Sequence, residues 1–332
     1  MSKTKKKVAI NGFGRIGRQF LHIALNQHTE FEVVAINDLG DTKTLAHLFE
    51  FDSTYGHCKN KINYNENALV VDDKTIAVFG ERDPEKLPWK ELGVDIVIES
   101  TGIFCDREGA SKHLTAGAKK VIISAPAKGE AVPTCVLGAN LLDFEKENII
   151  SNASCTTNCI APILRVIQDT FGIERGDMVT IHSITNDQRI LDLPHSDLRR
   201  ARTAGVSMIP TTTGAAKAVG LVIPELKGRL DGYAVRVPTV TVSLADLCLE
   251  LKKPATVKEV HEAFTQANPK YVGMEPRPLV SIDFRGDERS GIVDTQFTRV
   301  DGNRLHLTAW YDNEWGYSNR LADLCGLVSQ AF

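Results

Sequence analysis

The chain has 332 residues, which corresponds to about two domains at roughly 150 residues per domain. Hydrophobic residues make up 42% and charged residues 24%, so the composition is that of a globular protein and excludes wholesale disorder. The 39 Lys and Arg residues nearly balance the 42 Asp and Glu residues. The resulting net charge of −3 excludes the strongly basic character expected for a primary nucleic-acid role.

No stretch of the sequence approaches the roughly 18 consecutive apolar residues of a membrane span, and the N-terminus lacks the apolar region of a secretory signal. The seven cysteines are an odd number, spread along the chain without a CxxC pair. This pattern favours a reducing compartment and predicts no structural zinc site. We therefore expect a cytoplasmic protein with no metal and no membrane association. The lysine-rich residues 3–7 are interpreted as a short solvated N-terminus.

The first half of the chain alternates short β-branched runs with helical patterns. Buried parallel strands are predicted at residues 8–10, 31–36, 95–98 and 121–123. Between the first two, Ile16, Phe20, Ile23 and Ala24 recur at the spacing of one helix face. Strands that alternate with helices predict an α/β, doubly wound parallel sheet, which binds ligands at the carboxyl ends of its strands.

The pattern changes after about residue 150. A helix is predicted from apolar residues at helical spacing, and Gly172 ends it; these residues are Ile160, Ile163, Leu164, Ile167 and Phe171. Alternating segments at 178–184, 233–244, 247–251 and 304–310 then predict a second, α+β domain with a mixed or antiparallel sheet. A final helix contains Leu321, Leu324, Cys325 and Val328. No linker-like tract separates the halves, so we expect them to be packed together.

A glycine-rich turn follows the first predicted strand. Gly12, Gly14 and Gly17 form a GxGxxG run that opens the first predicted helix, which is the context in which this pattern binds a dinucleotide. The helix N-terminus offers N–H groups and a partial positive charge to phosphates. Asp38 ends the second strand about 20 residues later, where a carboxylate can accept hydrogen bonds from ribose hydroxyls and repels a 2′-phosphate. The turn therefore favours NAD over NADP, the alternative being a glycine turn without a ligand.

Cys155 lies in the segment SNASCTTNC (151–159), where a predicted strand ends and the long helix begins. A helix N-terminus stabilises a thiolate, which makes Cys155 a candidate nucleophile, and the adjacent hydroxyls are candidate capping groups and phosphate ligands. Cys159, one turn later, is predicted to pack in the core beside Ile163. The same packing role is expected for Cys105, Cys135, Cys248 and Cys325, whereas the sequence leaves Cys58 undecided.

His182 ends the predicted strand at 178–181. If this strand returns beside the strand that ends before Cys155, a thiolate–imidazolium pair can form. Spacing alone does not decide between a catalytic and a structural histidine, and the two interpretations stay open.

Several motifs are distributed along the chain: NGFGRIG (11–17), SNASCTTNC (151–159), TNDQRILDLPH (185–195), LRRAR (198–202), IPTTTGAAKA (209–218), AVRVPT (234–239) and WYDNEWGYSNR (310–320). Together they resemble the phosphorylating glyceraldehyde-3-phosphate dehydrogenase family over nearly the whole chain. The resemblance implies an NAD-binding Rossmann domain at residues 1–154, a catalytic domain at 155–318 and a C-terminal helix at 319–332 that packs back on the first domain.

The resemblance also implies a reaction. Cys155 would attack the aldehyde of glyceraldehyde 3-phosphate to give a thiohemiacetal, and His182 would take the hydroxyl proton as hydride leaves for NAD. The resulting thioester would then be cleaved by inorganic phosphate to give 1,3-bisphosphoglycerate.

The site residues implied by the resemblance fall into three groups. The NAD contacts would be Gly12, Gly14, Arg15, Ile16, Gly17, Asp38, Thr101, Ser124, Asn313 and Tyr317. Inorganic phosphate would bind Ser154, Thr156, Thr213 and Gly214, and the substrate C3-phosphate would bind Thr185, Asp187 and Arg236, with Arg200 nearby. The family further implies a homotetramer in which residues 184–207 reach a neighbouring subunit. From the residues alone, Arg199, Arg200 and Arg202 are a solvated face or form subunit salt bridges.

The chain departs from the family pattern in places. Ile184 stands where a tyrosine is usual, which removes a hydroxyl near the base, and Asp38-Leu39-Gly40 has a small residue where bulkier ones are frequent. NAD is the preferred cofactor, and some NADP use is left open. Two alternatives are an erythrose-4-phosphate dehydrogenase, which hydrolyses its acyl-enzyme, and a non-catalytic redox-sensing binding protein. The intact TNDQ and TTTGAA segments favour the phosphate-using enzyme over the first. The complete set of phosphate and nicotinamide positions would have no purpose in the second.

Overall fold

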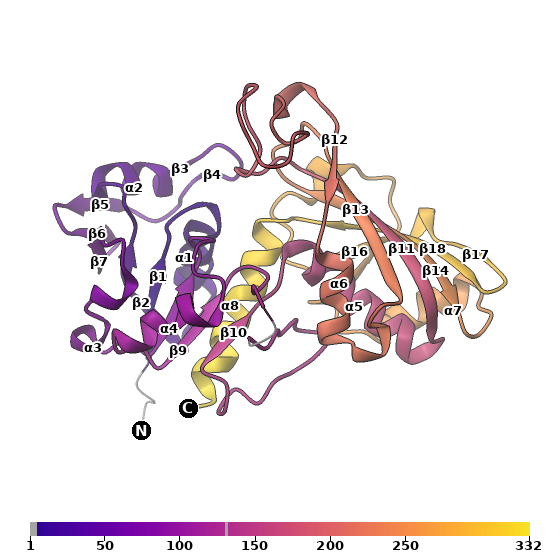
Figure 1. Ribbon diagram of the computed structural model, residues 1–332, viewed down its shortest axis with the longest axis horizontal. Helices are drawn as coiled ribbons and strands as arrows, with labels where there is room; N and C mark the ends of the chain where they lie inside the picture. The colour runs from indigo at the N-terminus through magenta and orange to yellow at the C-terminus, as the bar shows by residue number, and fades with distance from the viewer. Residues whose placement is uncertain (1–4, 130–131) are drawn as a thin grey trace. The chain divides into compact units, whose positions relative to one another are not determined.

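The computed structural model describes residues 5–129 and 132–332, and the chain divides into two compact units (Figure 1). The first contains Met1–Cys135, Leu142–Ala153 and Ser318–Phe332, and the second contains Val136–Leu141 and Ser154–Tyr317. Positions 3 and 4 of the lysine-rich run lie outside the described residues, whereas Lys6 and Lys7 belong to the first strand.

The segment Val136–Leu141 belongs to the second unit, although the sequence placed it within the first domain. Its packing explains the difference. Gly138 has a left-handed φ of 89° and lies against the ring of Tyr271, so close that a Cβ there would approach the ring to 2.8 Å. This contact attaches the segment to the second unit through an interaction that local sequence does not reveal.

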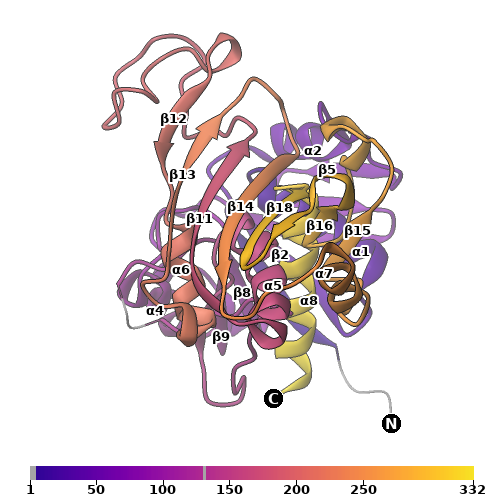
Figure 2. The ribbon, with the colours of Figure 1, turned by 90° about the vertical axis from the view of Figure 1, so that its right-hand side faces the viewer.

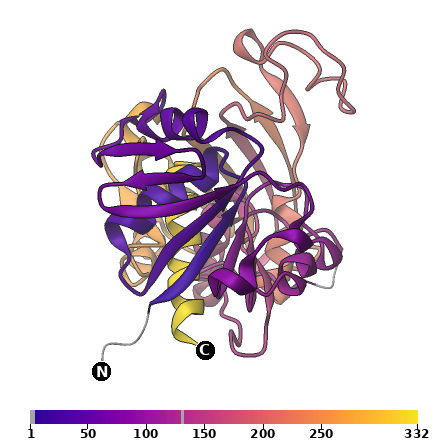
Figure 3. The same ribbon diagram turned by 90° about the vertical axis from the view of Figure 1, so that its left-hand side faces the viewer.

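The first unit is built on a sheet whose eight strands, among the described residues, lie in the order β10, β9, β8, β1, β2, β7, β6, β5 (Figure 3). They are β1 (Lys6–Asn11), β2 (Phe31–Asn37), β5 (Ile62–Asn65), β6 (Ala68–Val71), β7 (Lys74–Phe79), β8 (Ile96–Glu99), β9 (Lys120–Ile123) and β10 (Ile149–Ser151). From β10 to β7 neighbouring strands are parallel, and β6 and β5 add an antiparallel edge. The α/β class and the parallel sheet predicted from the sequence are confirmed.

The helices in the N-terminal part of the first unit differ in whether a side chain caps their first turn. They are α1 (Arg15–Gln27), α2 (Thr42–Glu50), α3 (Trp89–Leu92) and α4 (Arg107–Thr115), and a short hairpin joins β3 (Phe51–Asp52) to β4 (Gly56–His57). Asp41 and Asp106 cap α2 and α4 by accepting main-chain N–H bonds from the first turn. Phe20, Ile23 and Ala24 of α1 are buried, as their spacing predicts.

The second unit is built on a mixed sheet of eight strands within the described part of the chain, in the order β12, β13, β11, β14, β18, β16, β15, with β17 paired to β18 (Figure 2). The strands are β11 (Ile173–His182), β12 (Ile209–Thr212), β13 (Leu230–Arg236), β14 (Ser243–Leu251), β15 (Val272–Glu275), β16 (Gly291–Asp294), β17 (Arg299–Asp301) and β18 (Arg304–Tyr311). Helix α5 (Cys155–Thr170) packs across β11, β14, β16 and β18, and contacts α6 (Ala215–Val222) and α7 (Val257–Thr265).

Two sequence expectations about these strands are wrong. The alternating segment 233–244 is two strands, β13 and β14, which flank β11 on either side; β13 runs parallel to β11 and β14 runs antiparallel to it. The chain therefore has to reverse between them, and Pro238, which has no N–H for a ladder bond, lies in that connection. The strand that ends at His182 also does not lie beside the strand before Cys155, because β11 and β10 belong to different sheets.

The last helix, α8 (Trp315–Gln330), begins four residues before the range 319–332 that the sequence indicated. Its residues from Ser318 onward belong to the first unit, and Leu321, Leu324, Cys325 and Val328 are buried there. None of the helices in the described ranges is both long and apolar enough to cross a membrane.

Candidate active site

A pocket of about 350 Å³ lies at the carboxyl ends of the parallel strands in the first unit. Four of the predicted cofactor residues line it together: Gly12, Gly14, Asp38 and Thr101. Gly12 has a φ of 94°, and a Cβ there would lie 2.7 Å from the main chain of Ser100 and Thr101. A Cβ on Gly17 would lie 2.2 Å from the carbonyl oxygen of Gly12. The glycines therefore serve the close approach of α1 to the strand ends that the motif predicts.

Asp38 is anchored at the rim of this pocket. Its Oδ2 accepts a hydrogen bond from the main-chain N–H of Phe13 at 2.7 Å, and its Oδ1 accepts one from Gly40 at 2.9 Å. Charge-assisted bonds of this kind hold the carboxylate in one orientation. The side chain is therefore tied to the glycine turn and can still accept further bonds, because a carboxylate offers about four acceptor positions.

The other predicted cofactor residues of the first unit do not line the pocket. Arg15 is paired with Asp52 across 2.6 Å, and Ile16 lies beside it in the first turn of α1. Ser124 follows β9, where its N–H donates to the carbonyl of Glu99 at 2.9 Å. These residues stay predictions as cofactor contacts.

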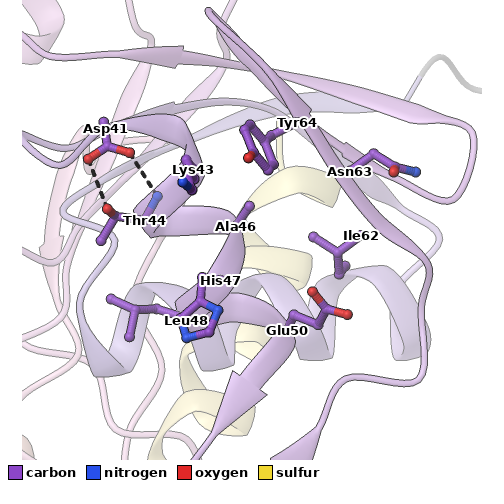
Figure 4. A pocket seen from close by; sticks show the side chains of 10 residues that line it. All are labelled: Asp41, Lys43, Thr44, Ala46, His47, Leu48, Glu50, Ile62, Asn63 and Tyr64. Atoms are coloured by element: carbon purple, nitrogen blue, oxygen red, sulfur yellow. Dashed lines mark hydrogen bonds between the residues drawn. The ribbon is translucent and has the colours of Figure 1, made fainter.

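A larger pocket of about 690 Å³ lies between α2 and β5 (Figure 4). None of the predicted site residues lines it. Asp41 at its edge caps α2, because its carboxylate accepts hydrogen bonds from the N–H and the hydroxyl of Thr44. Of these two pockets, the smaller one at the strand ends is therefore the candidate cofactor site, because predicted cofactor residues line it.

Cys155 begins α5, after a turn that the backbone makes at some cost. Ala153 has a left-handed φ of 56°, which is unfavourable for a residue with a Cβ. Ser154 then caps the helix, its Oγ accepting a hydrogen bond from Thr157 N–H at 3.1 Å. The cap and the turn fix the position of the Cys155 sulfur at the N-terminus of the helix.

The structure brings Cys155 and His182 together even though their strands are not neighbours. The sulfur lies 3.5 Å from His182 Nε2. On the other side of the ring, Nδ1 lies 2.8 Å from the carbonyl of Ser183 and 2.5 Å from Arg236 Nη1. The approach arises because α5 packs on the sheet that contains β11, with His182 at the end of that strand.

Burial controls the protonation of this pair. It raises the pKa of Cys155, and the nearby Arg236 charge and hydrogen bonds from Thr156 only partly oppose that effect. Burial, and after it the charge of Arg236, lower the pKa of His182 to about 3. Both shifts favour a neutral thiol beside a neutral imidazole, whereas the sequence left a thiolate–imidazolium pair as one that can form. Desolvation is the largest cause of both shifts.

Tyr311 is part of the site, although the sequence interpretation passed over it. Its hydroxyl lies 2.9 Å from Thr156 Oγ1 and 2.8 Å from Thr180 Oγ1, and its ring contacts that of His182 edge-on. Burial raises its pKa far above the ordinary value, so it is a neutral hydroxyl. The alternation of β18, which buries every second residue up to Tyr311, is the signal that could have indicated it.

Asn313, predicted as a nicotinamide contact, is hydrogen-bonded to the residue that follows His182, within the second unit. Its Oδ1 accepts hydrogen bonds from the hydroxyls of Ser183 at 2.8 Å and Ser243 at 3.0 Å. These two bonds to Oδ1 fix the orientation of the amide, so that Nδ2 points away from Ser183 and Ser243. Val242, with a left-handed φ of 66°, holds Ser243 at the start of β14. Tyr317 is buried in the first turn of α8.

The predicted phosphate ligands are arranged in two groups. The first group, predicted for inorganic phosphate, lies at the starts of α5 and α6. The hydroxyl of Thr213 accepts a hydrogen bond from the N–H of Ala215 at 3.2 Å, and Gly214 is the N-cap of α6. The Thr156 hydroxyl is hydrogen-bonded to that of Tyr311. In the loop after β11, Asp187 is paired with Arg200, whose Nε donates to Thr211 at 2.9 Å. Thr185 closes a turn with Gln188, and Arg236 lies against His182.

The arrangement corresponds to a known family. A family model described as "Glyceraldehyde 3-phosphate dehydrogenase, NAD binding domain" matches residues 6–107, and one described as "Glyceraldehyde 3-phosphate dehydrogenase, C-terminal domain" matches residues 154–313. The glyceraldehyde-3-phosphate dehydrogenase of Geobacillus stearothermophilus is 55% identical over 330 residues, covering 97% of this chain and 98% of the relative. Glyceraldehyde-3-phosphate dehydrogenase 1 of Bacillus cereus is 54% identical over 330 residues, with the same coverage of both chains. The chain belongs to the glyceraldehyde-3-phosphate dehydrogenase family.

As a member of this family, the protein is an NAD-dependent oxidoreductase, and the resemblance seen in the sequence is confirmed. The pocket fits the cofactor in two respects. Gly14 faces open space, because outside its chain neighbours no atom lies within 4 Å of where a Cβ would be, and it has no side chain that would compete for the N–H groups of the first turn of α1. No group of three or more side chains suited to a metal ion occurs among the described residues.

The remaining cysteines of this dehydrogenase differ in their surroundings. Cys159, Cys105, Cys135 and Cys325 are buried, in agreement with the packing role expected for them, whereas Cys248 is only partly buried. Cys58, which the sequence left undecided, lies 3.5 Å from His22 Nδ1, but burial raises the pKa of its thiol. Cys155 is thus distinguished by its place at a helix N-terminus beside His182.

Proposed function

We propose that the protein catalyses the oxidation of glyceraldehyde 3-phosphate with NAD and inorganic phosphate to give 1,3-bisphosphoglycerate and NADH. The observation that carries this proposal is the 3.5 Å approach of Cys155 Sγ to His182 Nε2 at the N-terminus of α5. NAD supplies the hydride acceptor. The protein's own residues supply the nucleophile, the base and the anion sites.

Cys155 acts as the nucleophile, and the neutral imidazole of His182 takes its proton as the sulfur bonds to the aldehyde carbon. The negative charge that develops on the aldehyde oxygen is stabilised by the main-chain N–H of Cys155, at the positive end of α5. His182 returns this proton to the oxygen, which gives the thiohemiacetal hydroxyl and a neutral ring. The neutral ring then takes the hydroxyl proton as hydride leaves the carbon. Because its Nδ1 faces Ser183 and Arg236, the ring presents Nε2 to the reacting atoms.

The thioester formed on Cys155 retains the free energy of the oxidation. Inorganic phosphate attacks its carbonyl carbon, the C–S bond breaks, and the departing Cys155 thiolate takes up the proton that His182 holds. We assign this phosphate to Ser154, Thr156, Thr213 and Gly214. The hydroxyl of Thr156 is engaged with Tyr311, so Thr156 contributes its main-chain N–H. The C3-phosphate of the substrate is assigned to Thr185 and Arg236, with Asp187 orienting Arg200. Arginine forks and hydroxyls are the groups that phosphate recognition requires.

For the cofactor, we assign Gly12, Gly14, Arg15, Ile16 and Gly17 to the pyrophosphate. Asp38 is assigned to the ribose, and Thr101 and Ser124 to the adenosine side. Asn313 receives the nicotinamide carboxamide, with Tyr317 near the ring. The carboxylate of Asp38 favours NAD, with limited NADP use. In functional terms we assign residues 1–154 to the cofactor domain, 155–318 to catalysis and 319–332 to a helix that packs back on the cofactor domain.

We further propose that the enzyme is a cytoplasmic homotetramer in which residues 184–207 contact another subunit. This loop exposes large apolar side chains, among them Ile190 at 86% and Leu198 at 82%, and such a patch indicates a protein contact. Arg200 and Arg202 are paired within the chain, with Asp187 and Asp192 respectively, so they do not depend on a partner. Sedimentation that gives a monomer at micromolar concentration would refute the tetramer.

One assay tests the reaction. NADH and NADPH formation from glyceraldehyde 3-phosphate is measured with and without inorganic phosphate. We expect turnover that requires phosphate and is faster with NAD. Turnover that is indifferent to phosphate would identify the hydrolytic alternative, an erythrose-4-phosphate dehydrogenase. Absence of turnover with all three reactants would favour a redox-sensing binding protein.

A further inference from the structure

A buried polar network lies beneath the dinucleotide pocket, and the proposed reaction uses neither of its titratable members. Glu99, at the end of β8, is 1% exposed, and His113, on α4, is completely buried. Removing a carboxylate from water costs several kcal/mol unless its oxygens are fully hydrogen-bonded. The hydrogen-bond partners of the Glu99 carboxylate therefore indicate which groups it orients.

Trp89 determines which nitrogen of His113 carries the proton. An indole N–H can only donate, and Trp89 Nε1 lies 3.1 Å from His113 Nδ1. In the neutral ring Nδ1 is therefore the acceptor and Nε2 carries the hydrogen. Nε2 lies 3.1 Å from Glu99 Oε2, so His113 donates to the carboxylate.

The Glu99 carboxylate in turn orients two residues that line the pocket. Its Oε2 also accepts from Asn11 Nδ2 at 2.5 Å. Its Oε1 accepts from the main-chain N–H of Thr101 at 2.8 Å and from the Thr101 hydroxyl. With its proton directed to Glu99, the Thr101 oxygen accepts the N–H of Ile103 at 3.0 Å. Donors thus surround both oxygens of Glu99.

The orientation of Asn11 is passed on along the strand ends. Because Asn11 Nδ2 faces Glu99, its Oδ1 accepts from Asn37 Nδ2 at 2.7 Å. Asn37 Oδ1 then accepts the main-chain N–H of Glu81 at 2.8 Å, and Asn37 Nδ2 donates to the Glu81 carbonyl at 2.9 Å. Asn37 and Glu81 also line the pocket, beside Asp38. One carboxylate therefore sets the donor and acceptor direction from β8 through β1 and β2 to the segment after β7.

We propose that Glu99, held by His113 and Trp89, is a positioning residue for the adenosine half of the dinucleotide site. Its negative charge orients Thr101, Asn11 and Asn37 into the arrangement that receives the adenosine ribose next to Asp38. This inference rests on the cofactor site proposed above. Glu99 touches no reacting atom, so its effect appears in affinity for the adenosine half and not in the chemistry at Cys155.

The test is Glu99→Gln in the full-length, cofactor-free protein, with ADP-ribose and NAD titrated by calorimetry. The amide has the shape of the carboxylate but can accept on only one atom, so either Thr101 or the Asn11–His113 side loses its acceptor. We expect the Kd of both ligands to rise about tenfold, which is about 1.4 kcal/mol. In turnover, KM for NAD should rise in parallel, whereas kcat at saturating NAD and KM for glyceraldehyde 3-phosphate stay within about twofold.

Two further variants separate positioning from loss of packing. Trp89→Phe removes the donor that holds His113, and it should weaken ADP-ribose binding in the same direction. Val97→Ala, on the same strand β8 and fully buried without a side-chain hydrogen bond, should lower the melting temperature while leaving the Kd of ADP-ribose unchanged.

Specific results would overturn the inference. One is a Glu99→Gln protein that binds ADP-ribose within about twofold of the wild type. Another is a Val97→Ala protein that loses as much affinity as Glu99→Gln. If Glu99→Gln does not fold, an unchanged Kd in Trp89→Phe refutes the inference on its own. Failure of the wild type to bind either ligand would instead refute the dinucleotide site.

Discussion

The charge of Arg236 is expected to lower the pKa of the Cys155 thiol and so to raise its reactivity. Its Nη1 lies 2.5 Å from His182 Nδ1, and Nε2 of the same ring lies 3.5 Å from the Cys155 sulfur. Along this line of contacts the guanidinium is within about 8 Å of the sulfur, where one unit charge is worth about 2 kcal/mol at an effective dielectric constant of about 20. That energy corresponds to about 1.5 units in the pKa of the thiol.

The perturbation is Arg236→Met, which removes the charge and keeps most of the side-chain length. Burial raises the pKa of Cys155, and Arg236 is the first of the influences that lower it. Without Arg236, the midpoint pH of Cys155 alkylation should rise by about one to two units, and alkylation at neutral pH should slow by about tenfold or more. The assay is the pH dependence of alkylation by iodoacetamide, a neutral reagent that Arg236 does not steer, read by mass spectrometry at Cys155.

Two control variants separate the effect of the charge from other effects and from background alkylation. Arg236→Lys keeps the charge while losing the guanidinium fork, so its alkylation midpoint should stay close to that of the wild type. Cys155→Ser reports the background from Cys58 and Cys248, which are partly exposed. The electrostatic reasoning is refuted if the midpoint moves by less than about 0.3 units in Arg236→Met, or if Arg236→Lys shifts it equally.

Four further predictions concern separate parts of the molecule. Cys155→Ser should abolish NADH formation and retain NAD binding by calorimetry; residual turnover would contradict the role of the nucleophile. Asp38→Ala should narrow the ratio of kcat/KM for NAD to that for NADP, and an unaltered ratio would remove Asp38 from the ribose contact. The pKa of His182 is lowered from 6.5 to about 3, so the unfolded chain binds a proton that the folded protein excludes, and stability falls as the pH drops through this window. His182→Asn should therefore lose less of its melting temperature than the wild type between about pH 7 and about pH 5, and an equal loss would disprove the linkage. Thr256→Ala should cost about 1 kcal/mol in denaturant unfolding, because Thr256 and Glu259 form a capping box at the start of α7; unchanged stability would show that the box contributes nothing.

The local features of the dinucleotide site were predictable from the sequence because short-range rules govern them. The turn at Gly12 and Gly14, the strand before it and the apolar face of α1 all follow from residues close together in the chain. Asp38 could be placed because the end of β2 is set by its own β-branched run. The capping of α5 by Ser154 follows in the same way from hydroxyl groups at a helix start.

The pair of Cys155 and His182 could not be derived from local sequence. The family resemblance implied His182 as the base, but the strand pairing expected to bring it to Cys155 was wrong, because β11 and β10 belong to different sheets. Tyr311 joins the same site from the last strand of the second unit. Such encounters depend on how α5 lies on the sheet, and no local periodicity encodes that packing.

The sequence by itself determined the family and the glycine turn, and it singled out Cys155 as the candidate nucleophile, since each resides in contiguous residues whose chemistry is local. Only the tertiary structure decided that burial raises the pKa of Cys155 and lowers that of His182, because desolvation comes from segments distant in the sequence. It also decided that Glu99 and His113, 14 positions apart, form one buried pair beneath the cofactor pocket. The physical reason is the same for both: burial and hydrogen-bond direction are properties of the packed molecule, set by neighbours that the order of residues does not specify.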